Sequence, residues 1–347
     1  MAHSHRRERK AACPAVPGLR TTRECEDIVA RERAAARRLL LPLFLLLVTS
    51  VVASGAVSSA RGTTAHRAGE ATVVPAATSR GWTMPRHPTK VLVVIVENHS
   101  YTQMRTKMPY LATLSRRYGY ARDWRAIRHP SLPNYLAIFG GSTFGVTNDD
   151  SPRKQARHIG RARSIFDQAR AAHKTTATYA ESMPEHCFGS TYPVHNPRYA
   201  VRHNPWTYFP AGRTGCDLRD VPLSHMAAAV RRNKLPNVGL VVPNLCHDAH
   251  DCALVEADGF LRRTLTPVLH SLDFRHGRLV VVVTADEDDG TSGNRVLTTV
   301  IASRIHGKVV TGRLTHYSLT RFMAGVLGVR APRHAATAPR MGTRFGL

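Results

Sequence analysis

Five short β-type runs, each followed at once by a polar cluster, constrain the fold of this 347-residue chain more than any other feature. Stretches with helical character lie between or after them, which gives a regular alternation along the chain. Continuous apolar strands alternating with amphipathic helices are typical of a mostly parallel sheet covered on both faces. The sequence therefore predicts an α/β fold, a three-layer αβα sandwich with a mostly parallel central sheet. The expected strands lie at 90–96, 122–127, 176–180, 238–242 and 279–284, and the expected helices at 107–118, 163–173, 223–233, 256–271 and 316–327.

The polar clusters that follow these runs are candidates for a functional site. In mostly parallel sheets, ligands bind just outside the carboxyl ends of the strands. Glu97-Asn98 follows the first run, His129-Pro130-Ser131 the second, and Asp286 to Asp289 the fifth. We therefore expect these clusters to meet at one edge of the sheet.

Four consecutive acids, Asp286 to Asp289, are unusual in a chain with 24 Asp and Glu residues. Adjacent carboxylates repel one another and are stable together where a cation or hydrogen-bond donors neutralise them. A solvated acidic turn is the alternative for the four acids alone, and the long apolar run before them favours a site for a hard cation with oxygen ligands. Glu97 and Asn98 offer two more oxygen ligands, although an Asn is also common where a strand ends.

Ser131 lies where the second run turns into a helix, with Pro133 in the opening turn. One interpretation is a helix N-cap. The other is functional, because the free N–H groups and the dipole of a helix N-terminus attract phosphate. A metal ion beside the hydroxyl would lower its pKa and make it a nucleophile. Asn134 could then donate an amide N–H to a phosphoryl oxygen.

The sequence leaves the role of several histidines open. The segment from His247 to Asp251 holds two imidazoles and two carboxylates between Cys246 and Cys252, and either a ligand site or a polar loop fits it. His203 and His316 could contact phosphate, and a capping or surface role is the alternative for each. Imidazole can bind a transition metal, orient a nucleophile or donate to a phosphate oxygen.

The cysteines indicate an oxidising compartment. Cys187, Cys216, Cys246 and Cys252 are an even number, and no two have the spacing of a zinc knuckle. Two disulfides are expected, with 187–216 and 246–252 the simplest of three possible pairings. The spacing does not choose among them.

The N-terminal region divides into three parts by composition. Residues 1–38 form a basic lead, 39–60 an apolar signal peptide or membrane anchor, and 61–88 a disordered linker rich in Ser, Thr, Ala, Gly and Arg. The apolar stretch 39–53 is shorter than the ~20 residues that span a bilayer. We expect a secreted or cell-envelope protein, with anchoring through 39–53 as the alternative.

The net charge of +25, from 49 Lys and Arg against 24 Asp and Glu, does not indicate nucleic acid. The arginines are scattered, and they lack the interleaved aromatic residues that would stack bases. A cationic surface attracts phosphate-bearing substrates, and peripheral association with an anionic membrane is also compatible with it. The sequence leaves the oligomeric state open.

Taken together, these segments resemble the bacterial phosphoesterase family of secreted acid phosphatases and phospholipases C, which has an alkaline-phosphatase-like fold. The likeness is greatest to the short acid phosphatases secreted by mycobacteria. The family's order is kept over roughly residues 90 to 335, and we expect a catalytic domain at 89–335 and a C-terminal tail at 336–347. The matching segments are 96–100, 129–136, 141–147, 202–206, 242–244, 250–251, 284–290 and 315–317.

The resemblance implies an exported, metal-dependent acid phosphatase that hydrolyses phosphate monoesters, phosphoinositides among them, through a phosphoserine intermediate. A phosphorylated small molecule or a phospholipid headgroup is then the partner. By the same resemblance, Ser131 would be the nucleophile, and a divalent metal ion (Ca²⁺, Mg²⁺, Mn²⁺ or Zn²⁺) would be held by Glu97, Asn98, Asp286 and Glu287. His203, His250 and His316 would contact the phosphate or protonate the leaving alcohol, with His129, Asn134 and Asp251 binding substrate.

The sequence is also compatible with two alternative functions. A phospholipase C acting on phosphodiesters shares the scaffold. A non-catalytic, cationic cell-surface binding protein that has kept the fold belongs to a different class.

Overall fold

The structure is a computed structural model and describes residues 85–347. The segments expected at 1–38 and 39–60, and most of the linker at 61–88, lie outside the described residues. Within residues 85–347, no helix combines the length and the apolar character needed to cross a membrane.

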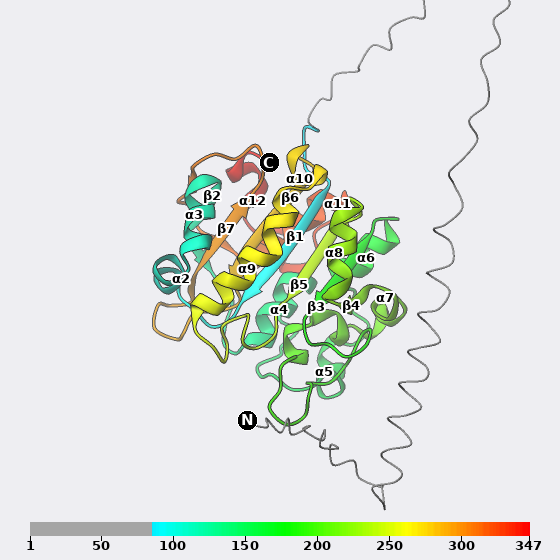
Figure 1. Ribbon diagram of the computed structural model, residues 1–347. Helices are drawn as coiled ribbons and strands as arrows, with labels where there is room; N and C mark the ends of the chain where they lie inside the picture. The colour runs from blue at the N-terminus through cyan, green and yellow to red at the C-terminus, as the bar shows by residue number, and fades with distance from the viewer. Residues whose placement is uncertain (1–84) are drawn as a thin grey trace, which may run out of the picture. The chain divides into compact units, whose positions relative to one another are not determined.

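The centre of the described domain is one nine-stranded sheet (Figure 1). Its strands follow the order β4-β3-β5-β1-β6-β7-β2-β8, and β9 pairs with β2. All strand pairs are parallel except those of β7, which runs antiparallel to both β6 and β2. The strands are β1 Lys90–Val96, β2 Gly119–Arg125, β3 Thr176–Ala180, β4 Asp220–Pro222, β5 Val238–Val242, β6 Leu279–Ala285, β7 Arg295–Ile301, β8 Lys308–Val310 and β9 Leu314–Thr315.

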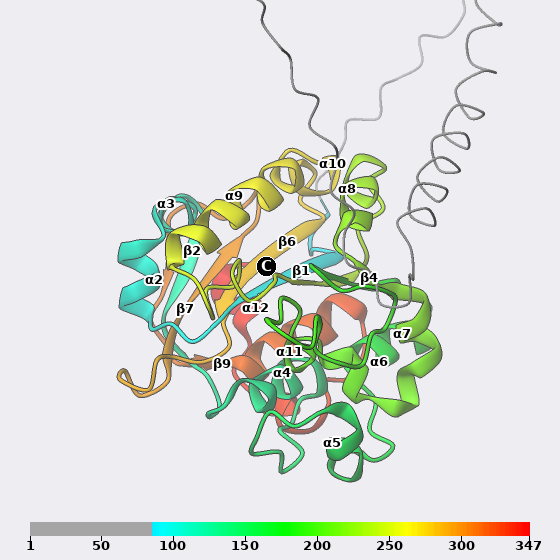
Figure 2. The same cartoon turned by 60° about the horizontal axis from the view of Figure 1, so that its bottom comes forward.

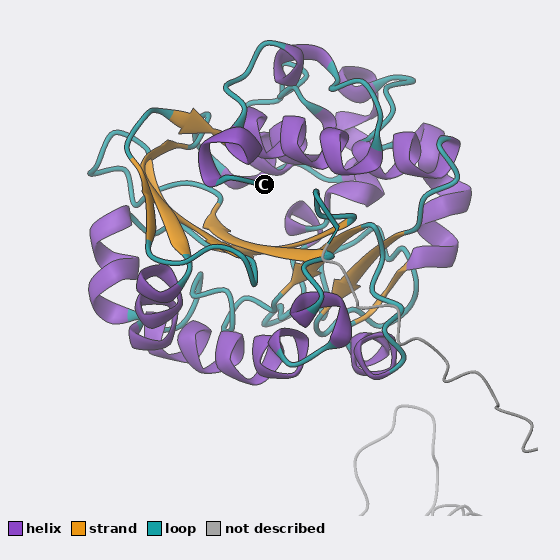
Figure 3. Ribbon diagram, turned by 90° about the horizontal axis from the view of Figure 1, so that it is seen from above, coloured by secondary structure: helices purple, strands orange, loops and turns teal. Residues whose placement is uncertain are grey.

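Helices cover both faces of the sheet, as Figures 2 and 3 show. On one face lie α2 (Tyr101–Lys107), α3 (Pro109–Arg117), α8 (Ser224–Arg231), α9 (Leu254–Leu269) and α10 (Leu272–Arg275). On the other lie α4 (Ser131–Gly140), α5 (Pro152–Ile159), α6 (Ile165–Ala171) and α11 (His316–Leu327). Two further helices are α7 (Arg213–Arg219) and α12 (Met341–Phe345). The predicted three-layer α/β architecture with a mostly parallel sheet is confirmed.

The core explains why the apolar runs form central strands. Every residue of β6 is buried, and so are the last six of β1. Strands buried on both faces read as continuous Val and Ile rather than as an alternation. The short strands β4, β8 and β9 and the antiparallel β7 were not predicted, and β2 begins three residues earlier than expected, at Gly119.

Two further expectations concern the end of the chain and the cysteines. Residues 336–347 were expected to be a tail, but they include α12, whose Met341 and Phe345 are buried in the core. The chain end therefore packs as part of the folded domain. Cysteine pairing follows the simplest scheme, with disulfides Cys187–Cys216 and Cys246–Cys252.

Candidate active site

Two neighbouring strands bring the first acidic groups together. β1 and β6 pair in parallel, with Val96 opposite Ala285, so Glu97 and Asp286 leave the sheet side by side. The N–H of Asn98 donates to Asp286 Oδ1 at 3.2 Å. Asn98 has a φ of 48°, in the left-handed region that Asn tolerates better than most residues. The chain thus turns sharply just where the strand ends, and the carboxylates stay at the edge of the sheet.

Ser131 lies beside Glu97 and comes from a helix that covers one face of the sheet. It is the first residue of α4, all of whose residues are buried. Its Oγ donates to Glu97 Oε2 at 3.0 Å and lies 3.5 Å from Asn98 Oδ1. One turn further along α4, the buried Tyr135 hydroxyl donates to Glu97 Oε1. The hydroxyl, the amide and two carboxylates thus converge, although Glu97 and Asp286 are 189 residues apart.

Burial raises the pKa of three carboxyl groups at the site, and the charge of Asp286 adds to the effect on Glu97 and Glu287. Burial, and then the charges of Asp286 and Asp248, hold the pKa of Glu97 well above its usual range. Burial raises the pKa of Asp286 to about 6 and outweighs the lowering effect of its hydrogen bond from Asn98. Burial and the charge of Asp286 raise the pKa of Glu287 to about 9. Carboxylates crowded in this way require protons or a cation to be stable.

The side chains fit a divalent cation. Asp286 Oδ2 is buried and has no hydrogen-bond partner, and it lies among carboxylate, amide and hydroxyl oxygens of the kind that hard cations prefer. A second set overlaps the first, since Glu97, His203 and Asp248 each offer a ligand atom and these atoms lie within 4.8 Å of one another. The chemistry of this donor set therefore matches the metal that the sequence predicts.

His203 is buried between two carboxylates of the site. Its Nδ1 is 3.2 Å from Asp248 Oδ2 and its Nε2 is 3.2 Å from Glu97 Oε2. The ring stacks on Tyr135 with the centroids 5.3 Å apart. Burial, and then the positive charge of Arg202, hold the pKa of His203 well below its usual range. The His203 ring is thereby held between two carboxylates, and its buried Nε2 has no hydrogen-bond partner within residues 85–347.

His250 and Asp251 occupy the more exposed rim. His250 Nδ1 contacts Asp251 Oδ1 at 2.7 Å, and its Nε2 accepts from Arg202 Nη2 at 3.0 Å. Arg202 Nε also lies 3.6 Å from Asp149 Oδ2, and Asp149 Oδ1 accepts the N–H of Leu132, the residue after Ser131. Because an arginine only donates hydrogen bonds, the His250 Nε2 atom acts as the acceptor in this contact.

Glu287, His129 and Asn134 form the opposite side of the site. His129 is half-exposed, and its ring nitrogens face Glu287 Oε2 at 3.2 Å and Asp288 Oδ1 at 3.1 Å. The Asn134 amide donates to the Arg128 carbonyl at 2.6 Å and to Glu287 Oε2 at 3.1 Å. Both amide hydrogens are used in this way, so Asn134 braces the loop before α4 rather than presenting a free donor to phosphate.

Part of the acidic cluster, Asp286 to Asp289, faces the candidate cation site, and part of it forms a turn. Asp286 and Glu287 face the site. The Asp288 carboxylate accepts the N–H groups of Gly290, Ser292 and Asn294, which closes the turn between β6 and β7. Asp289 is exposed and accepts from the Gln103 amide at 2.8 Å. The first two acids therefore belong to the candidate site, and the last two form a turn.

His316 is close to the site but has no free ring nitrogen. Its Nδ1 accepts from Trp124 Nε1 at 3.1 Å, and its Nε2 lies 2.6 Å from the carbonyl oxygen of Asp286. Burial lowers the pKa of His316 to about 4. The expectation that this histidine contacts phosphate does not match these contacts. It supports the backbone that carries Asp286, because both of its nitrogens are already bonded.

Four residues at the site were not among the predicted ones: Tyr135, Asp149, Arg202 and Asp248. Tyr135 and Arg202 lie inside the segments 129–136 and 202–206, next to residues with a predicted role. Asp248 lies in the polar segment from His247 to Asp251, whose pattern does not distinguish it from its neighbours. Asp149 is in a loop with no distinguishing pattern, and only the fold brings it to the N-terminus of α4.

Another buried carboxylate, that of Asp220, leads to a testable pH prediction. Asp220 Oδ2 accepts from the Asn204 amide at 2.7 Å, and burial raises the pKa of Asp220 to about 8. The cysteines beside it, Cys187 and Cys216, are joined in a disulfide, so they offer no thiolate to a metal.

We expect Asp220→Asn to stabilise the domain at high pH. In the unfolded chain the Asp220 carboxyl titrates at pH ~3.9, whereas in the folded domain it keeps its proton up to about pH 8. The free energy of unfolding that this proton contributes is therefore lost as the pH rises from about 4 to about 8. The Asn variant does not titrate. Its melting temperature should exceed that of the wild type at pH 8.5, with a smaller gap at pH 5. Parallel melting curves at the two pH values would contradict the assignment.

Comparisons with known proteins agree with this geometry. The model of the Phosphoesterase family matches residues 96–330. Phosphatidylinositol-3-phosphatase of Mycobacterium tuberculosis is 29% identical over 258 residues, which covers 74% of this chain and 82% of that protein. The phosphate-repressible acid phosphatase of Penicillium chrysogenum is 30% identical over 60% of this chain, which spans about half (51%) of that protein.

A solved structure shares the fold at low sequence identity. The lipoteichoic acid synthase LtaP from Listeria monocytogenes superposes with a TM-score of 0.51 at 10% identity, covering 74% of this chain and 80% of that one. A protein in the alkaline phosphatase superfamily from Vibrio parahaemolyticus gives a TM-score of 0.49 at 13% identity, covering 73% and 69%. The family match begins at the end of the first predicted strand and spans the other four, the serine and the acidic cluster, and the chain therefore belongs to the Phosphoesterase family.

Proposed function

We propose that this chain is a metal-dependent acid phosphatase that hydrolyses phosphate monoesters with Ser131 as the nucleophile. One observation carries the proposal. The Ser131 hydroxyl, at the N-terminus of a buried helix, lies 3.0 Å from a carboxylate of a cluster that includes the unpartnered Asp286 Oδ2. A helix N-terminus favours the phosphate anion, and the cluster favours a cation beside it. The phosphatase relatives support the same class of reaction.

The metal would be held by Glu97, Asn98, Asp286 and Glu287. When bound, a divalent ion neutralises phosphoryl charge and lowers the pKa of a neighbouring hydroxyl. The oxygen-rich donor set suits Ca²⁺, Mg²⁺ or Mn²⁺, and His203 nearby makes Zn²⁺ a further candidate.

The residues of the chain supply the covalent step. Ser131 Oγ forms the bond to phosphorus as the bond from phosphorus to the ester oxygen breaks, and the contact to Glu97 Oε2 supports this carboxylate as acceptor of the serine proton. His250, at the exposed rim, would give the departing alcohol its proton once Nε2 is protonated and released from its contact with Arg202. Water then hydrolyses the phosphoserine, which releases inorganic phosphate and restores the Ser131 hydroxyl.

Arg202 is the cation best placed to bind the phosphoryl oxygens. It lies at the rim between Asp149 and His250, and its charge partly offsets the rise in pKa that burial causes in Glu97 and Asp248. A guanidinium binds two phosphate oxygens at once in a planar fork, and its contact to His250 uses one donor of five.

Arg202→Met should therefore raise KM for an aryl phosphate about tenfold, because a charge-assisted hydrogen bond contributes ~1.5–3 kcal/mol. Inhibition by inorganic phosphate should weaken by a similar factor. Steady-state kinetics measures both. Arg213→Met, at an exposed pair with Asp217, is the matched control and should behave as wild type. Unchanged KM and phosphate inhibition in Arg202→Met would remove this role.

The substrate class and the location belong to the same proposal. The mycobacterial relative is named for a phosphoinositide substrate, which supports a phospholipid headgroup or a small phosphorylated molecule as the substrate here. Two disulfides support an oxidising compartment and hence export. The catalytic domain would begin near residue 89 and extend to the chain end, since α12 packs into the core.

One assay separates the proposal from its alternatives. The purified chain is assayed between pH 5 and pH 7 on an aryl phosphate and on a phosphatidylcholine analogue, with and without a chelator. Chelator-sensitive turnover of the aryl phosphate alone supports the phosphatase. Preferential turnover of the phosphodiester would favour a phospholipase C, and turnover of neither would favour a binding protein.

A further inference from the structure

We infer that Glu181 and His247 are positioning residues for this reaction, acting through a loop that a disulfide closes. The loop runs from Asn244 to Cys252, between β5 and α9, and carries Asp248 and His250. The inference rests on the proposed function, because it concerns how the chain holds two groups of the candidate site.

Within this loop, Asp248 makes three direct contacts with residues of the candidate site. The Asp248 carbonyl accepts the N–H of Glu97 at 2.8 Å, so the loop fixes the backbone of the proposed metal ligand. Asp248 Oδ2 contacts His203 Nδ1 at 3.2 Å, and Asp248 Oδ1 accepts the N–H of His250 at 2.8 Å. A displacement of Asp248 would therefore move Glu97, His203 and His250 together.

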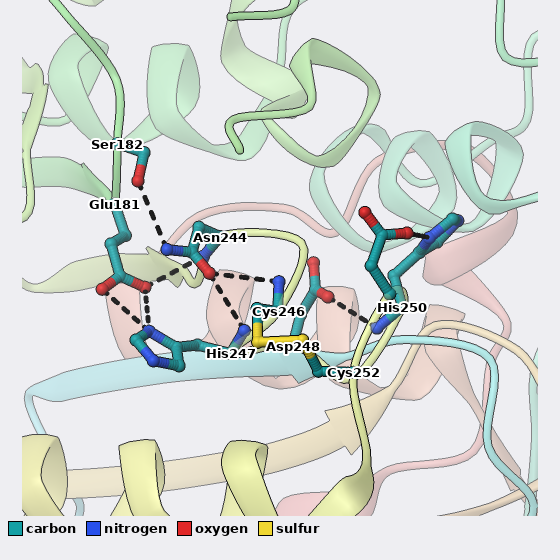
Figure 4. Close-up of a disulfide and its surroundings, with 9 residues drawn as sticks. Glu181, Ser182, Asn244, Cys246, His247, Asp248, His250 and Cys252 are labelled. Carbon is teal, nitrogen blue, oxygen red and sulfur yellow. Dashed lines mark hydrogen bonds and ion pairs between the residues drawn. A yellow bond between two sulfur atoms is a disulfide. The ribbon is translucent and has the colours of Figure 1, made fainter. Parts of the chain in front are cut away.

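The other side of the loop is held by Glu181, at the end of β3 (Figure 4). Both oxygens of its carboxylate lie 2.9 Å from His247 Nδ1, and Oε2 also accepts the N–H of Asn244 at 3.0 Å. The His247 ring stacks on Phe260 of α9, with the centroids 5.3 Å apart. Glu181 thus ties the loop to β3, and His247 ties it to α9.

Internal bonds make the loop one rigid unit. The Asn244 side-chain oxygen accepts the N–H groups of Cys246 and His247 at 3.1 and 3.0 Å, and the Asn244 carbonyl accepts that of Asp248 at 2.8 Å. The disulfide joins Cys246 to Cys252, on either side of Asp248 and His250. A segment outside helices and strands would otherwise lose its fixed geometry readily.

These contacts predict an effect on the chemical step rather than on the fold. Glu181 and His247 are partly exposed, with side chains 21% and 26% accessible, so losing either removes little buried apolar area. Asp248, by contrast, is buried against Glu97 and His203. Since small misplacements of catalytic groups cost large factors in rate, a loosened loop should lower kcat before it lowers stability.

The first arm of the test uses Glu181. Glu181→Ala should lower kcat on an aryl phosphate roughly tenfold, with KM within twofold of wild type and the melting temperature almost unchanged. Glu181→Gln should restore most of kcat, because its carbonyl still accepts the Asn244 N–H and its amide can donate to His247. Asp217→Ala, at an exposed ion pair of α7, is the control for loss of a surface carboxylate.

The second arm uses the disulfide. A dithiol such as dithiothreitol gives two electrons and two protons to Cys246–Cys252, which opens it to two thiols while the reagent becomes a cyclic disulfide. Activity should fall and return on reoxidation. The Cys246→Ser/Cys252→Ser variant should start with low kcat and lose the thiol response, whereas Cys187→Ser/Cys216→Ser should keep that response.

A third readout does not depend on activity. Amide hydrogen exchange of Glu97, Asp248 and His250 should speed up in Glu181→Ala relative to wild type, because their N–H groups are bonded within or to the loop. Wild-type kcat in both Glu181→Ala and the Cys246/Cys252 variant, or unchanged exchange, would overturn the inference. An inactive wild-type protein would overturn the proposed function instead, and the exchange data would still decide whether Glu181 holds the loop.

Discussion

Ser131→Ala is expected to lower kcat on an aryl phosphate by about 10³-fold or more, because it removes the proposed nucleophile. The fold should be unaffected. The residue before α4 is Pro130, and Ser131 makes no side-chain cap bond at that helix, so its removal costs no capping energy. Stopped assays give kcat, and the melting temperature gives the stability control. Activity equal to wild type would remove Ser131 as the nucleophile while leaving the family membership intact.

The second large effect is expected for Asp286→Asn. Both the affinity for the metal and the activity on an aryl phosphate should fall by about 10²-fold or more. The neutral amide attracts a cation less strongly than the carboxylate it replaces. It also removes one of the crowded buried charges that raise the pKa of Glu97, so the metal-free variant should melt at or above the temperature of the metal-free wild type. Elemental analysis after dialysis measures the metal, and calorimetry measures the stability.

The matched control for this variant lies three residues away in the same acidic cluster. Asp289 is exposed and contacts Gln103 and Thr291 rather than the site. Asp289→Asn should keep both metal and activity. A metal content in Asp286→Asn equal to that of wild type, or equal losses in the two variants, would contradict the assignment of Asp286 as a ligand.

The sequence predicts the centre of the fold well because a physical pattern marks it. β1 and β6 are buried on both faces and read as unbroken apolar runs, and the residues that follow them are polar. Parallel neighbours place such residues at one edge, so the convergence of Glu97 and Asp286 follows from the strand pattern alone. Strands such as β4 and β9, of three and two residues, leave no comparable pattern.

The roles of individual polar residues are harder to predict, because they depend on contacts between distant segments. His316 looks like a candidate phosphate ligand at the start of a helix, yet Trp124 and the Asp286 carbonyl occupy its two nitrogens. Asn134 looks like a free amide, yet it braces the loop before α4. Asp149 has no local signal at all, and reaches the N-terminus of α4 only through the fold.

Trapping the covalent intermediate tests the central claim most directly. The protein is mixed with excess aryl phosphate, quenched in acid within the first turnovers, digested and analysed by mass spectrometry. The account predicts one added phosphoryl group on the peptide that contains Ser131, and none in the Ser131→Ala variant. A phosphoryl group on a histidine, or rapid turnover with no modified peptide at any quench time, would contradict it.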